Sequence, residues 1–369
     1  MLSYQIETFG KPLAQVLRTT PEPQGTEVIV NVQSCGVCHS DVHLHDGYFD
    51  LGGGAKLDMS RALNLPRTLG HEIAGTVVAV GPDAQDASSG PGAQDASSGP
   101  GAQGASALIG KRRVVFPWIG CGTCAICTAG DEHMCNAPRA LGINRDGGFA
   151  DHVVVPHPKY LIEFDPLPIE QACTYACSGL TAFGALKKIA RPGAGDAVLI
   201  IGAGGVGLSG IRLAKQMYGI APIVAEVDKS KWDIARDAGA GEVIDPTADG
   251  AAKALFKATG GGVAAAIDFV GAGATFAFGL GALRKGGMLV CVGLFGGATQ
   301  IVPAMVTMKG VSIVGSYVGN LADMQELMTI ARSGSLPAMP LTTQPLANAT
   351  QALDDLRAGR IKGRTILQA

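Results

Sequence analysis

Nine residues near the N-terminus, Cys35 to His43, bring together two thiols, a hydroxyl and two imidazoles in the order Cys-Gly-Val-Cys-His-Ser-Asp-Val-His. Thiolate and neutral imidazole are ligands that suit a zinc ion. A hydroxyl at Ser40 and a titratable ring at His43 are the parts of a proton relay. Taken alone, the stretch fits a buried thiol beside a surface histidine equally well. The rest of the sequence has to decide between the two interpretations.

Further along the chain, four cysteines have the spacing C-x2-C-x2-C-x7-C, at Cys121, Cys124, Cys127 and Cys135. Four thiolates close a tetrahedral zinc site and leave no open position, as in structural zinc sites. An iron–sulfur cluster is the alternative, because closely spaced cysteines also hold such clusters, but no proline follows the last cysteine here. A disulfide pair does not suit a chain without an export signal. We therefore predict a structural zinc ion.

A glycine-rich turn follows a predicted strand over 197–201 and opens a predicted helix over 206–217. Its residues are Gly202, Ala203, Gly204, Gly205, Val206 and Gly207. In a dinucleotide-binding fingerprint the first glycine makes the tight turn, the second lets the backbone approach the pyrophosphate, and the third lets helix and strand pack. The helix N-terminus offers amides and a positive dipole end to the phosphates. We predict that this turn binds a dinucleotide.

The acidic residue Glu226 closes the next predicted strand, 19 residues after Gly207. A carboxylate at this point binds the adenosine ribose hydroxyls and repels a 2′-phosphate, which favours NAD over NADP. The nearby Asp228 is better explained as the N-cap of a helix predicted over 229–238.

Two further residues are candidates for a second set of zinc ligands, although a histidine in such a triplet is by itself more often a hydrogen-bonded turn residue. His71 lies in a Gly-His-Glu triplet before a predicted strand over 73–80, and Cys177 precedes the fingerprint. With Cys38 they supply two thiolates and one imidazole, a set that leaves the fourth position of a zinc ion open. Cys173 is the rival for the third position. We choose Cys177, because the Ser-Gly that follows it gives the backbone room to turn.

Length and composition bound the class of protein. A chain of 369 residues predicts about two domains. A net charge of −2 and the absence of a Lys/Arg cluster argue against a nucleic-acid partner or an anionic membrane. Nine cysteines without an apolar export signal indicate a reducing compartment and metal binding. We expect a cytoplasmic protein that does not span a membrane.

The two parts of the chain differ in pattern. The first part predicts short strands separated by turns, at 27–32, 73–80, 113–116 and 149–155. From 197 to 292, apolar strands alternate with helices, which indicates a parallel sheet covered on both faces. The tail predicts two helices and a strand. We expect 47–65 to be a loop with one helical turn. The nine-residue repeat at 84–101 predicts a mobile surface loop.

In this order, the motifs resemble those of the zinc-containing medium-chain alcohol dehydrogenase family, and Cys177-Ser-Gly-Leu-Thr181 and Gly363-Arg364 add to the match. Two thiolates and one imidazole hold the catalytic zinc of alcohol dehydrogenase. The resemblance implies an α/β protein with a GroES-like, β-rich catalytic domain built from both chain ends, 1–178 and 317–369. A Rossmann doubly wound parallel sheet, 179–316, is inserted between them. The first domain would include the 84–103 loop and a structural zinc lobe at 118–137.

The resemblance implies roles for single residues around a catalytic zinc. The ligands correspond to Cys38, His71 and Cys177. Glu72 corresponds to the nearby carboxylate and Asp41 to the partner of the zinc-bound imidazole. The proton-relay hydroxyl and histidine correspond to Ser40 and His43.

It further implies two zinc ions per chain, NAD as cofactor and a homo-oligomer, either a dimer or a tetramer. His39 and Arg364 match the basic residues on the pyrophosphate. Thr181 matches a residue near the nicotinamide and Lys231 one near the adenosine ribose. Glu226 departs from the family pattern, because many relatives carry Asp there.

Two segments, 52–65 and 84–103, are longer than the common family pattern. The first lies close to where the substrate should enter, so it bears on the class of substrate. Phe49, Phe116 and Trp118 are candidates for the walls of a substrate pocket, or else ordinary core residues.

We expect an enzyme that transfers a hydride between a primary or secondary alcohol and NAD, giving an aldehyde or ketone. Zinc with an open position is a Lewis acid that lowers the pKa of a bound alcohol, and the proton leaves through Ser40 and His43. The alternative within this fold is an aldehyde or ketone reductase using NADH or NADPH. An alternative from another class is a zinc-stabilised binding module. The near-neutral charge and the second zinc-ligand set argue against it.

Overall fold

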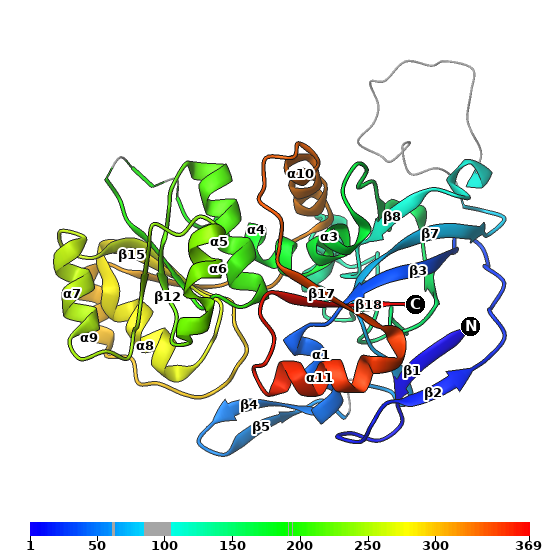
Figure 1. The fold of residues 1–369 in the computed structure, drawn as a ribbon, viewed down its shortest axis with the longest axis horizontal. Helices are drawn as coiled ribbons and strands as arrows, with labels where there is room; N and C mark the ends of the chain where they lie inside the picture. The colour runs from blue at the N-terminus through cyan, green and yellow to red at the C-terminus, as the bar shows by residue number, and fades with distance from the viewer. Residues whose placement is uncertain (61–62, 85–104, 191, 194) are drawn as a thin grey trace.

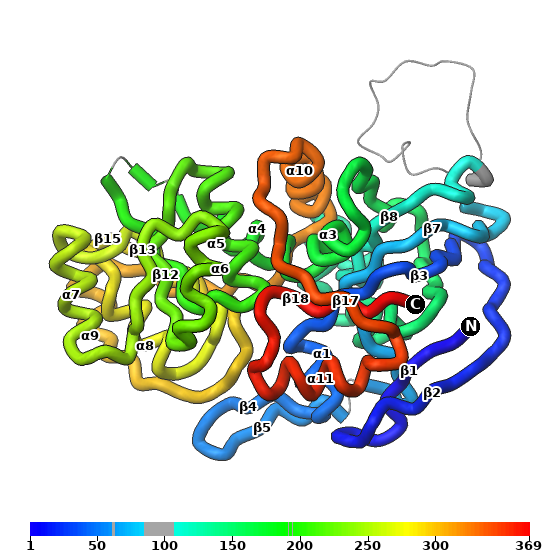
Figure 2. The backbone as a smooth tube through the Cα atoms, in the orientation of Figure 1, coloured from blue at the N-terminus to red at the C-terminus, as the bar shows by residue number. Residues whose placement is uncertain are grey.

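The computed structural model describes residues 1–60, 63–84, 105–190, 192–193 and 195–369. Two parts lie side by side in Figures 1 and 2: a parallel sheet with its helices at one end, and a β-rich part that holds both chain termini at the other. The predicted fold class is confirmed. In the described residues, no helix is long and apolar enough to cross a membrane.

The parallel sheet has the strand order β13-β12-β11-β14-β15-β16. Its strands are short and apolar, as in β11, where all four side chains are buried. The order reverses between β11 and β14, which places a crevice at the carboxyl ends of these strands. The strands are β11 (Val198–Ile201), β12 (Ile223–Ala225), β13 (Glu242–Ile244), β14 (Val263–Asp268), β15 (Leu283–Cys291) and β16 (Ser312–Gly315).

Helices connect these strands, and they follow the apolar periodicity of the sequence. They are α5 (Gly205–Tyr218), α6 (Trp232–Asp237), α7 (Ala251–Ala258), α8 (Gly273–Ala282) and α9 (Pro303–Lys309). A 3₁₀ turn, Lys229–Lys231, precedes α6. The side chain of Asp228 accepts a hydrogen bond from the backbone N–H of Ser230 at 3.0 Å, which confirms the predicted N-cap.

The β-rich part is built around a seven-stranded sheet with the order β10-β8-β7-β3-β18-β17, in which β9 also pairs with β3. The last strand, β18, lies antiparallel to β3, with Ile366 opposite Gly36. The two ends of the chain therefore share one sheet. The strands are β3 (Val28–Gly36), β7 (Glu72–Val80), β8 (Arg112–Val115), β9 (His152–Val155), β10 (Leu161–Ile162), β17 (Leu341–Pro345) and β18 (Arg364–Gln368). A smaller sheet joins β1 (Leu2–Ile6), β2 (Ala14–Leu17) and β6 (Arg67–Thr68).

Helices outside the parallel sheet connect the two parts and carry site residues. The helix α4 packs against both α5 and α10. Phe183 of α4 is fully buried in the main apolar core, together with Phe149 and Phe164 of the β-rich part. The helices are α1 (His39–Asp46), α3 (Ile169–Cys173), α4 (Ser178–Lys188), α10 (Leu321–Arg332) and α11 (Ala349–Arg357).

The prediction of a loop over 47–65 is wrong for much of its length. Residues 48–58 form an antiparallel hairpin of β4 (Tyr48–Gly52) and β5 (Ala55–Asp58). The turn between the strands is possible because Gly52, Gly53 and Gly54 have φ values of 82°, 61° and 84°, a region that glycine enters at little cost. The sequence signal was missed because all four residues of β5 are exposed, so no burial pattern marks the strand.

The loop expected at 84–103 lies, apart from Ala84, outside the described residues.

Two elements, the helix α9 and the strand β16, were not predicted from the sequence. They extend the parallel sheet by one edge strand beyond the 292 boundary of the predicted alternation.

Candidate metal centres and nucleotide site

Three residues from distant segments meet at one point between the two parts. Cys38 precedes α1, His71 precedes β7 and Cys177 precedes α4. Their ligand atoms all lie within 4.8 Å of one another, and all three residues are buried. The Nε2 atom of His71 is buried without a hydrogen-bond partner. Since zinc lies about 2.0–2.3 Å from such donors, this unpartnered nitrogen and the two thiols fit a zinc ion.

Asp41 connects two of these segments through hydrogen bonds to its carboxylate. One carboxylate oxygen accepts hydrogen bonds from the His71 ring Nδ1 and the Gly70 N–H, both at 3.2 Å. The other oxygen accepts from the Cys38 N–H at 2.9 Å. Burial lowers the pKa of His71, but the Asp41 carboxylate outweighs it and raises that pKa well above its usual range. With Nδ1 facing Asp41, Nε2 is directed as a metal-ligand nitrogen should be.

The contact between the two thiols of this group shifts their pKa values in opposite directions. The hydrogen bond with Cys177 is the main cause that lowers the pKa of Cys38 well below its usual range. The same contact, together with burial, raises the pKa of Cys177. One thiolate is thus already favoured before a metal is present, which suits a site whose ligands must lose protons to bind zinc.

Glu72 and Arg364 form a buried ion pair beside the zinc-ligand group. The other carboxylate oxygen of Glu72 accepts the Ser178 N–H at 2.9 Å. Burial raises the pKa of Glu72, and Arg364 opposes that rise. A side chain at Gly36 would collide with the Glu72 carboxylate, so a glycine is required there.

Arg364 also reaches the nucleotide turn. A Cβ atom on Gly205, the first residue of α5, would collide with the Arg364 side chain. Arg364 therefore lies between Glu72 of the β-rich part and the N-terminus of α5 in the parallel sheet. This guanidinium connects the zinc-ligand group with the predicted phosphate-binding turn.

The glycine-rich turn has the geometry of a dinucleotide fingerprint. Gly202 has a φ of 93°, as the tight turn requires. A Cβ atom on Gly207 would collide with the Gly202 carbonyl, and one on Gly204 would meet nothing within 4 Å. The open side at Gly204 leaves room for a ligand at the N-terminus of α5. Val206, the second residue of α5, is half-buried in this turn.

Glu226 lies buried at the end of β12, where its carboxylate binds two backbone amides. One oxygen accepts the N–H of Ala203 at 2.7 Å, and the other accepts that of Asp228 at 2.8 Å. Lys231 is half-buried nearby, and its ammonium lies 3.6 Å from an Asp228 carboxylate oxygen. The acid thus joins the glycine-rich turn to the segment after β12.

The remaining predicted site residues lie around the zinc-ligand group. His39 is exposed at the start of α1, and Ser40 and His43 are half-buried on the same helix. Partial burial lowers the pKa of His43. Thr181, on the first turn of α4, has its hydroxyl 4.0 Å from the Cys177 sulfur.

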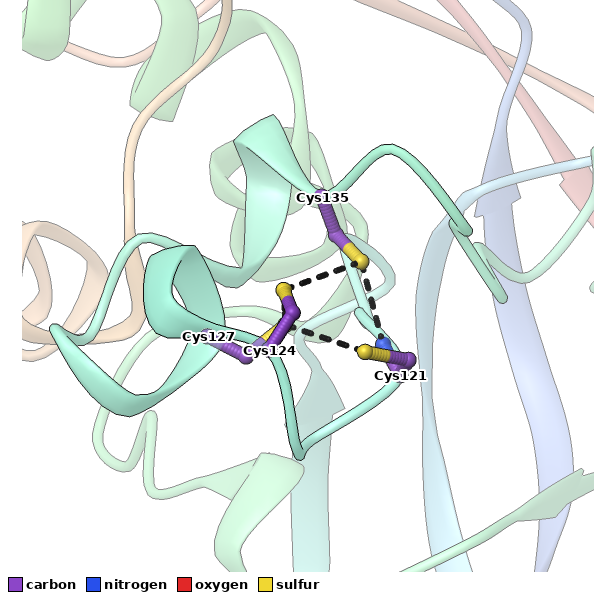
Figure 3. Close-up of side chains that lie close together, drawn as sticks. All are labelled: Cys121, Cys124, Cys127 and Cys135. Atoms are coloured by element: carbon purple, nitrogen blue, oxygen red, sulfur yellow. Dashed lines mark hydrogen bonds between the residues drawn. The ribbon is translucent and has the colours of Figure 1, made fainter.

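The second cysteine group folds within one short segment after β8, shown in Figure 3. Sulfur–sulfur distances are 3.5 Å for Cys124 and Cys127, 3.9 Å for Cys121 and Cys127, and 3.8 Å for Cys124 and Cys135. Four sulfurs about 2.3 Å from a central zinc ion would be roughly 3.8 Å apart. The N–H groups of Cys121 and Ala137 both donate to the Cys135 sulfur, at 3.3 Å each. This group therefore fits a closed zinc site.

Sequence reasoning missed Glu132, a buried residue that joins this cysteine segment to Lys159 and Tyr160. Its carboxylate accepts hydrogen bonds from the Tyr160 hydroxyl at 2.6 Å and the Gly120 N–H at 3.2 Å, and it pairs with the Lys159 ammonium at 2.6 Å. Burial raises the pKa of Glu132, but these donors lower it below its usual range. The residue is isolated in sequence from its partners Tyr160 and Lys159, so no local pattern marked it.

Of the three candidate wall residues, Trp118 contacts a predicted zinc ligand, Phe49 contacts His43 and Phe116 does neither. Phe116 is fully buried and stacks on Tyr160, so it belongs to the core. The Trp118 ring contacts the ring of His71 with centroids 5.4 Å apart. On its other side, 5.8 Å away, lies Tyr317, which sequence reasoning missed. Burial and the nearby Cys177 raise the pKa of Tyr317 to about 12.

Val318, which follows Tyr317, has a φ of 41°. Among the described residues, no other non-glycine residue has a positive φ. A β-branched residue rarely adopts this region, and such strain is common at functional sites. A Cβ atom on Gly184 of α4 would collide with the Val318 carbonyl. The strained backbone is therefore packed tightly against the helix that carries Thr181.

Comparison with known proteins gives a consistent result over the whole chain. A family model described as an alcohol dehydrogenase GroES-like domain matches residues 24–166, and one described as a zinc-binding dehydrogenase matches 205–333. Proteins described as NAD-dependent alcohol dehydrogenase from Sulfurisphaera tokodaii and Saccharolobus solfataricus are each 34% identical to this chain, covering 100% of it and 99% of their own length. The crystal structure of an alcohol dehydrogenase from Aeropyrum pernix is 29% identical, with a TM-score of 0.82 over all of both chains.

Proposed function

The chain belongs to the zinc-containing medium-chain alcohol dehydrogenase family, and on this basis we propose a function for its site. It is an NAD-dependent, zinc-dependent oxidoreductase that transfers a hydride between a primary or secondary alcohol and NAD, giving an aldehyde or ketone. One observation carries the proposal: Arg364 lies between a buried set of three zinc-type ligands and the glycine-rich turn. The metal and the nucleotide would then meet at one place.

Cys38, His71 and Cys177 would hold the catalytic zinc, and Cys121, Cys124, Cys127 and Cys135 would hold a structural one. Bound zinc supplies a Lewis acid that lowers the pKa of an alcohol hydroxyl, and the nicotinamide of NAD accepts the hydride. Asp41 orients His71 through the Nδ1 contact. Glu72 holds Arg364 and the start of α4 in place through its two contacts.

Ser40 and His43 would carry the substrate proton towards solvent. They are three residues apart on α1, so they lie on the same side of that helix. The Ser40 oxygen would accept the proton of the alcohol hydroxyl while the Ser40 hydroxyl donates its own proton to the imidazole of His43. Because His43 is only partly buried, it can release the proton to water.

For the nucleotide, the glycine-rich turn and Arg364 would bind the pyrophosphate, together with His39. Thr181 would lie beside the nicotinamide, since its hydroxyl is near Cys177. Glu226 and Lys231 would bind the adenosine ribose. Each carboxylate oxygen of Glu226 accepts one amide hydrogen bond, which leaves each a second acceptor position for a ribose hydroxyl.

Three coarser features support further parts of the proposal. All six strands of the parallel sheet lie between residues 198 and 315, which supports domains at 179–316 and at 1–178 with 317–369. Exposed apolar side chains in the segment between β15 and the edge strand β16, Phe295 (66% exposed), Val302 (59%) and Met308 (65%), support a homo-oligomer. All nine cysteines lie in the described residues and are free, as expected of a cytoplasmic protein.

The test of the function is direct. The purified protein is mixed with NAD and a panel of primary and secondary alcohols, and NADH absorbance is followed. Metal analysis of the same sample should return two zinc ions per chain. NADH formation that disappears after chelation and returns with zinc supports the proposal. No turnover with any alcohol, or with any aldehyde and NADH, would contradict it.

Cofactor choice has its own test at Glu226. Replacement by Ala removes the negative charge and the ribose acceptor, so NADP should be accepted better relative to NAD. The measurement is the ratio of kcat/KM values for the two cofactors. Wild-type protein that already prefers NADP would show that the role given to Glu226 is wrong. Asp228→Ala is the matched control, because it removes a nearby charge that caps a helix turn.

A further inference from the structure

The hairpin of β4 and β5 stands apart from the other sheets of the molecule. Its strands pair with each other and with no other strand in the described residues. It follows α1 directly, and Figure 1 draws it at the lower edge of the molecule, beside α1. A two-stranded hairpin is marginally stable by itself in water. Its position must therefore depend on what it contacts.

One of these contacts is backbone against backbone with the nucleotide-binding part. A Cβ atom on Gly52 would lie 2.5 Å from the Gly297 carbonyl carbon, and one on Gly296 would lie 2.5 Å from the Asp50 carbonyl oxygen. Real Cβ atoms essentially never come so close, so the hairpin and the loop after β15 fit together because both have glycine there.

The loop that the hairpin contacts is itself anchored at the nucleotide-binding crevice. The N–H groups of Phe295 and Gly296 donate to the carbonyls of Val270 and Gly271, at 3.0 and 3.1 Å. These carbonyls follow β14 at its carboxyl end, where the strand order reverses. The hairpin thus rests, through one loop, on the part of the sheet that should hold the nucleotide.

The other contact is with the proton relay. The Phe49 ring of β4 packs on the imidazole of His43, with centroids 4.7 Å apart and planes tilted by 33°. In the described residues, the ring nitrogens of His43 have no hydrogen-bond partner. Hydrogen bonds to neighbouring carboxylates therefore do not fix the orientation of this ring, and its packing on Phe49 is a contact that can orient it.

We propose that the β4–β5 hairpin is a clasp between the two domains and that Phe49 is a positioning residue for His43. When the hairpin is seated on residues 296–298, Phe49 holds the imidazole in the orientation needed to take the proton from Ser40. When the domains separate, the hairpin is released and the ring is free to rotate. The relay is then complete only when the nucleotide-binding domain is in place. The catalytic part of this inference rests on the function proposed above.

The clasp is tested with two glycines of the same turn. Gly52→Ala forces the hairpin away from residues 297 and 298. Gly54→Ala is the matched control, because its φ of 84° is close to the 82° of Gly52 and its Cβ would meet nothing within 4 Å. Both variants carry the same backbone strain, and Gly52→Ala alone disturbs the clasp. Gly296→Ala should reproduce the Gly52→Ala result from the opposite side.

The readout is the NMR spectrum of histidine-labelled protein, in which the Phe49 ring current shifts the carbon-bound protons of the His43 ring. Gly52→Ala and Gly296→Ala should move these resonances toward their position in Phe49→Leu, while Gly54→Ala leaves them as in wild type. If Gly52→Ala leaves the His43 resonances unchanged, the clasp does not exist. This arm needs no turnover, so it decides the clasp even if the proposed function fails.

The positioning role is tested by kinetics. Phe49→Leu should lower kcat about two- to tenfold, the factor that corresponds to one lost aromatic pair, with KM for NAD unchanged. Its solvent deuterium isotope effect on kcat should rise, because proton transfer becomes slower. Phe49→Tyr keeps the aromatic ring against His43 and should restore both quantities. Wild-type kcat and isotope effect in Phe49→Leu would overturn the positioning role.

Discussion

The two cysteine groups of this protein are built in opposite ways. The proposed structural group takes all four of its ligands from the fifteen residues from Cys121 to Cys135, in one segment after β8. The proposed catalytic group takes Cys38, His71 and Cys177 from three segments that only the folded chain brings together. The first is therefore a local property of the sequence, and the second is a property of the fold.

Each of the two groups depends on a buried carboxylate of its own. Asp41 accepts hydrogen bonds from Cys38, Gly70 and His71, so it joins two of the three catalytic segments. Glu132 accepts from Gly120 and Tyr160 and pairs with Lys159, so it joins the structural segment to the rest of the domain. If this contrast holds, a substitution in the proposed catalytic group should lower the rate of the reaction. A substitution in the proposed structural group should lower the stability of the fold.

The largest expected effect on chemistry comes from Cys177→Ala. Removing one of three ligands should empty the catalytic site and lower kcat/KM by about a thousandfold or more, because metal polarisation is worth several kcal/mol. The protein should retain one zinc ion and a melting temperature near that of wild type. Metal analysis and calorimetry check this. Full activity with two zinc ions would show that another residue completes the site.

Cys135→Ser should lower the stability of the protein and leave its kcat nearly unchanged. Structural zinc binding contributes on the order of 10 kcal/mol to the folding of small zinc domains, so losing one ligand should lower yield and melting temperature strongly. The folded fraction should keep a kcat close to that of wild type. A variant that is stable but inactive would show that the structural group acts in catalysis.

Asp41→Asn keeps the size of the side chain and removes its charge. Loss of such a partner of a metal-bound imidazole typically costs about 10- to 100-fold in metal affinity or activity. We expect zinc to leave more readily in a chelator titration, with the structural zinc retained. Equal affinity in variant and wild type would mean that the Asp41–His71 contact does not orient the ligand.

Glu132→Gln is the matched change at the structural group. A neutral amide weakens the hydrogen bonds from Tyr160 and Lys159, which should lower the free energy of unfolding by about 1–3 kcal/mol. The expected kcat is that of wild type. Denaturant unfolding monitored in parallel with kinetics checks both statements, and a fall in kcat without a loss of stability would contradict them.

The same contrast explains what the sequence could predict. The four-cysteine spacing and the glycine-rich turn are local, so their geometry followed from residue type and spacing. The meeting of Cys38, His71 and Cys177 was expected only through resemblance to a family, because no local pattern joins residues so far apart. Glu132 and Tyr317 were missed for the same reason, since their partners lie in other segments.

The hairpin at 48–58 was missed for a different reason. Strand prediction depends on alternating burial, and here the strand β5 is exposed along its length. Its pairing depends on a glycine turn and on close contact with residues 296–298, which lie in the other part of the molecule. Likewise β16 is an edge strand with partly exposed side chains, and its apolar signal is weak.

The smallest expected effect is that of Cys173→Ala, and it tests the assignment of the third catalytic ligand. Cys173 is fully buried in the core, where its thiol donates to the Glu170 carbonyl at 3.3 Å. In the described residues, the sulfur that lies within 4.8 Å of the Cys38 and His71 ligand atoms belongs to Cys177, and Cys173 is not part of that group. Loss of one sulfur from the core should cost about 1 kcal/mol of stability, with both zinc ions and kcat unchanged. Loss of one zinc ion in this variant, with Cys177→Ala retaining two, would reverse the assignment and make Cys173 the third ligand.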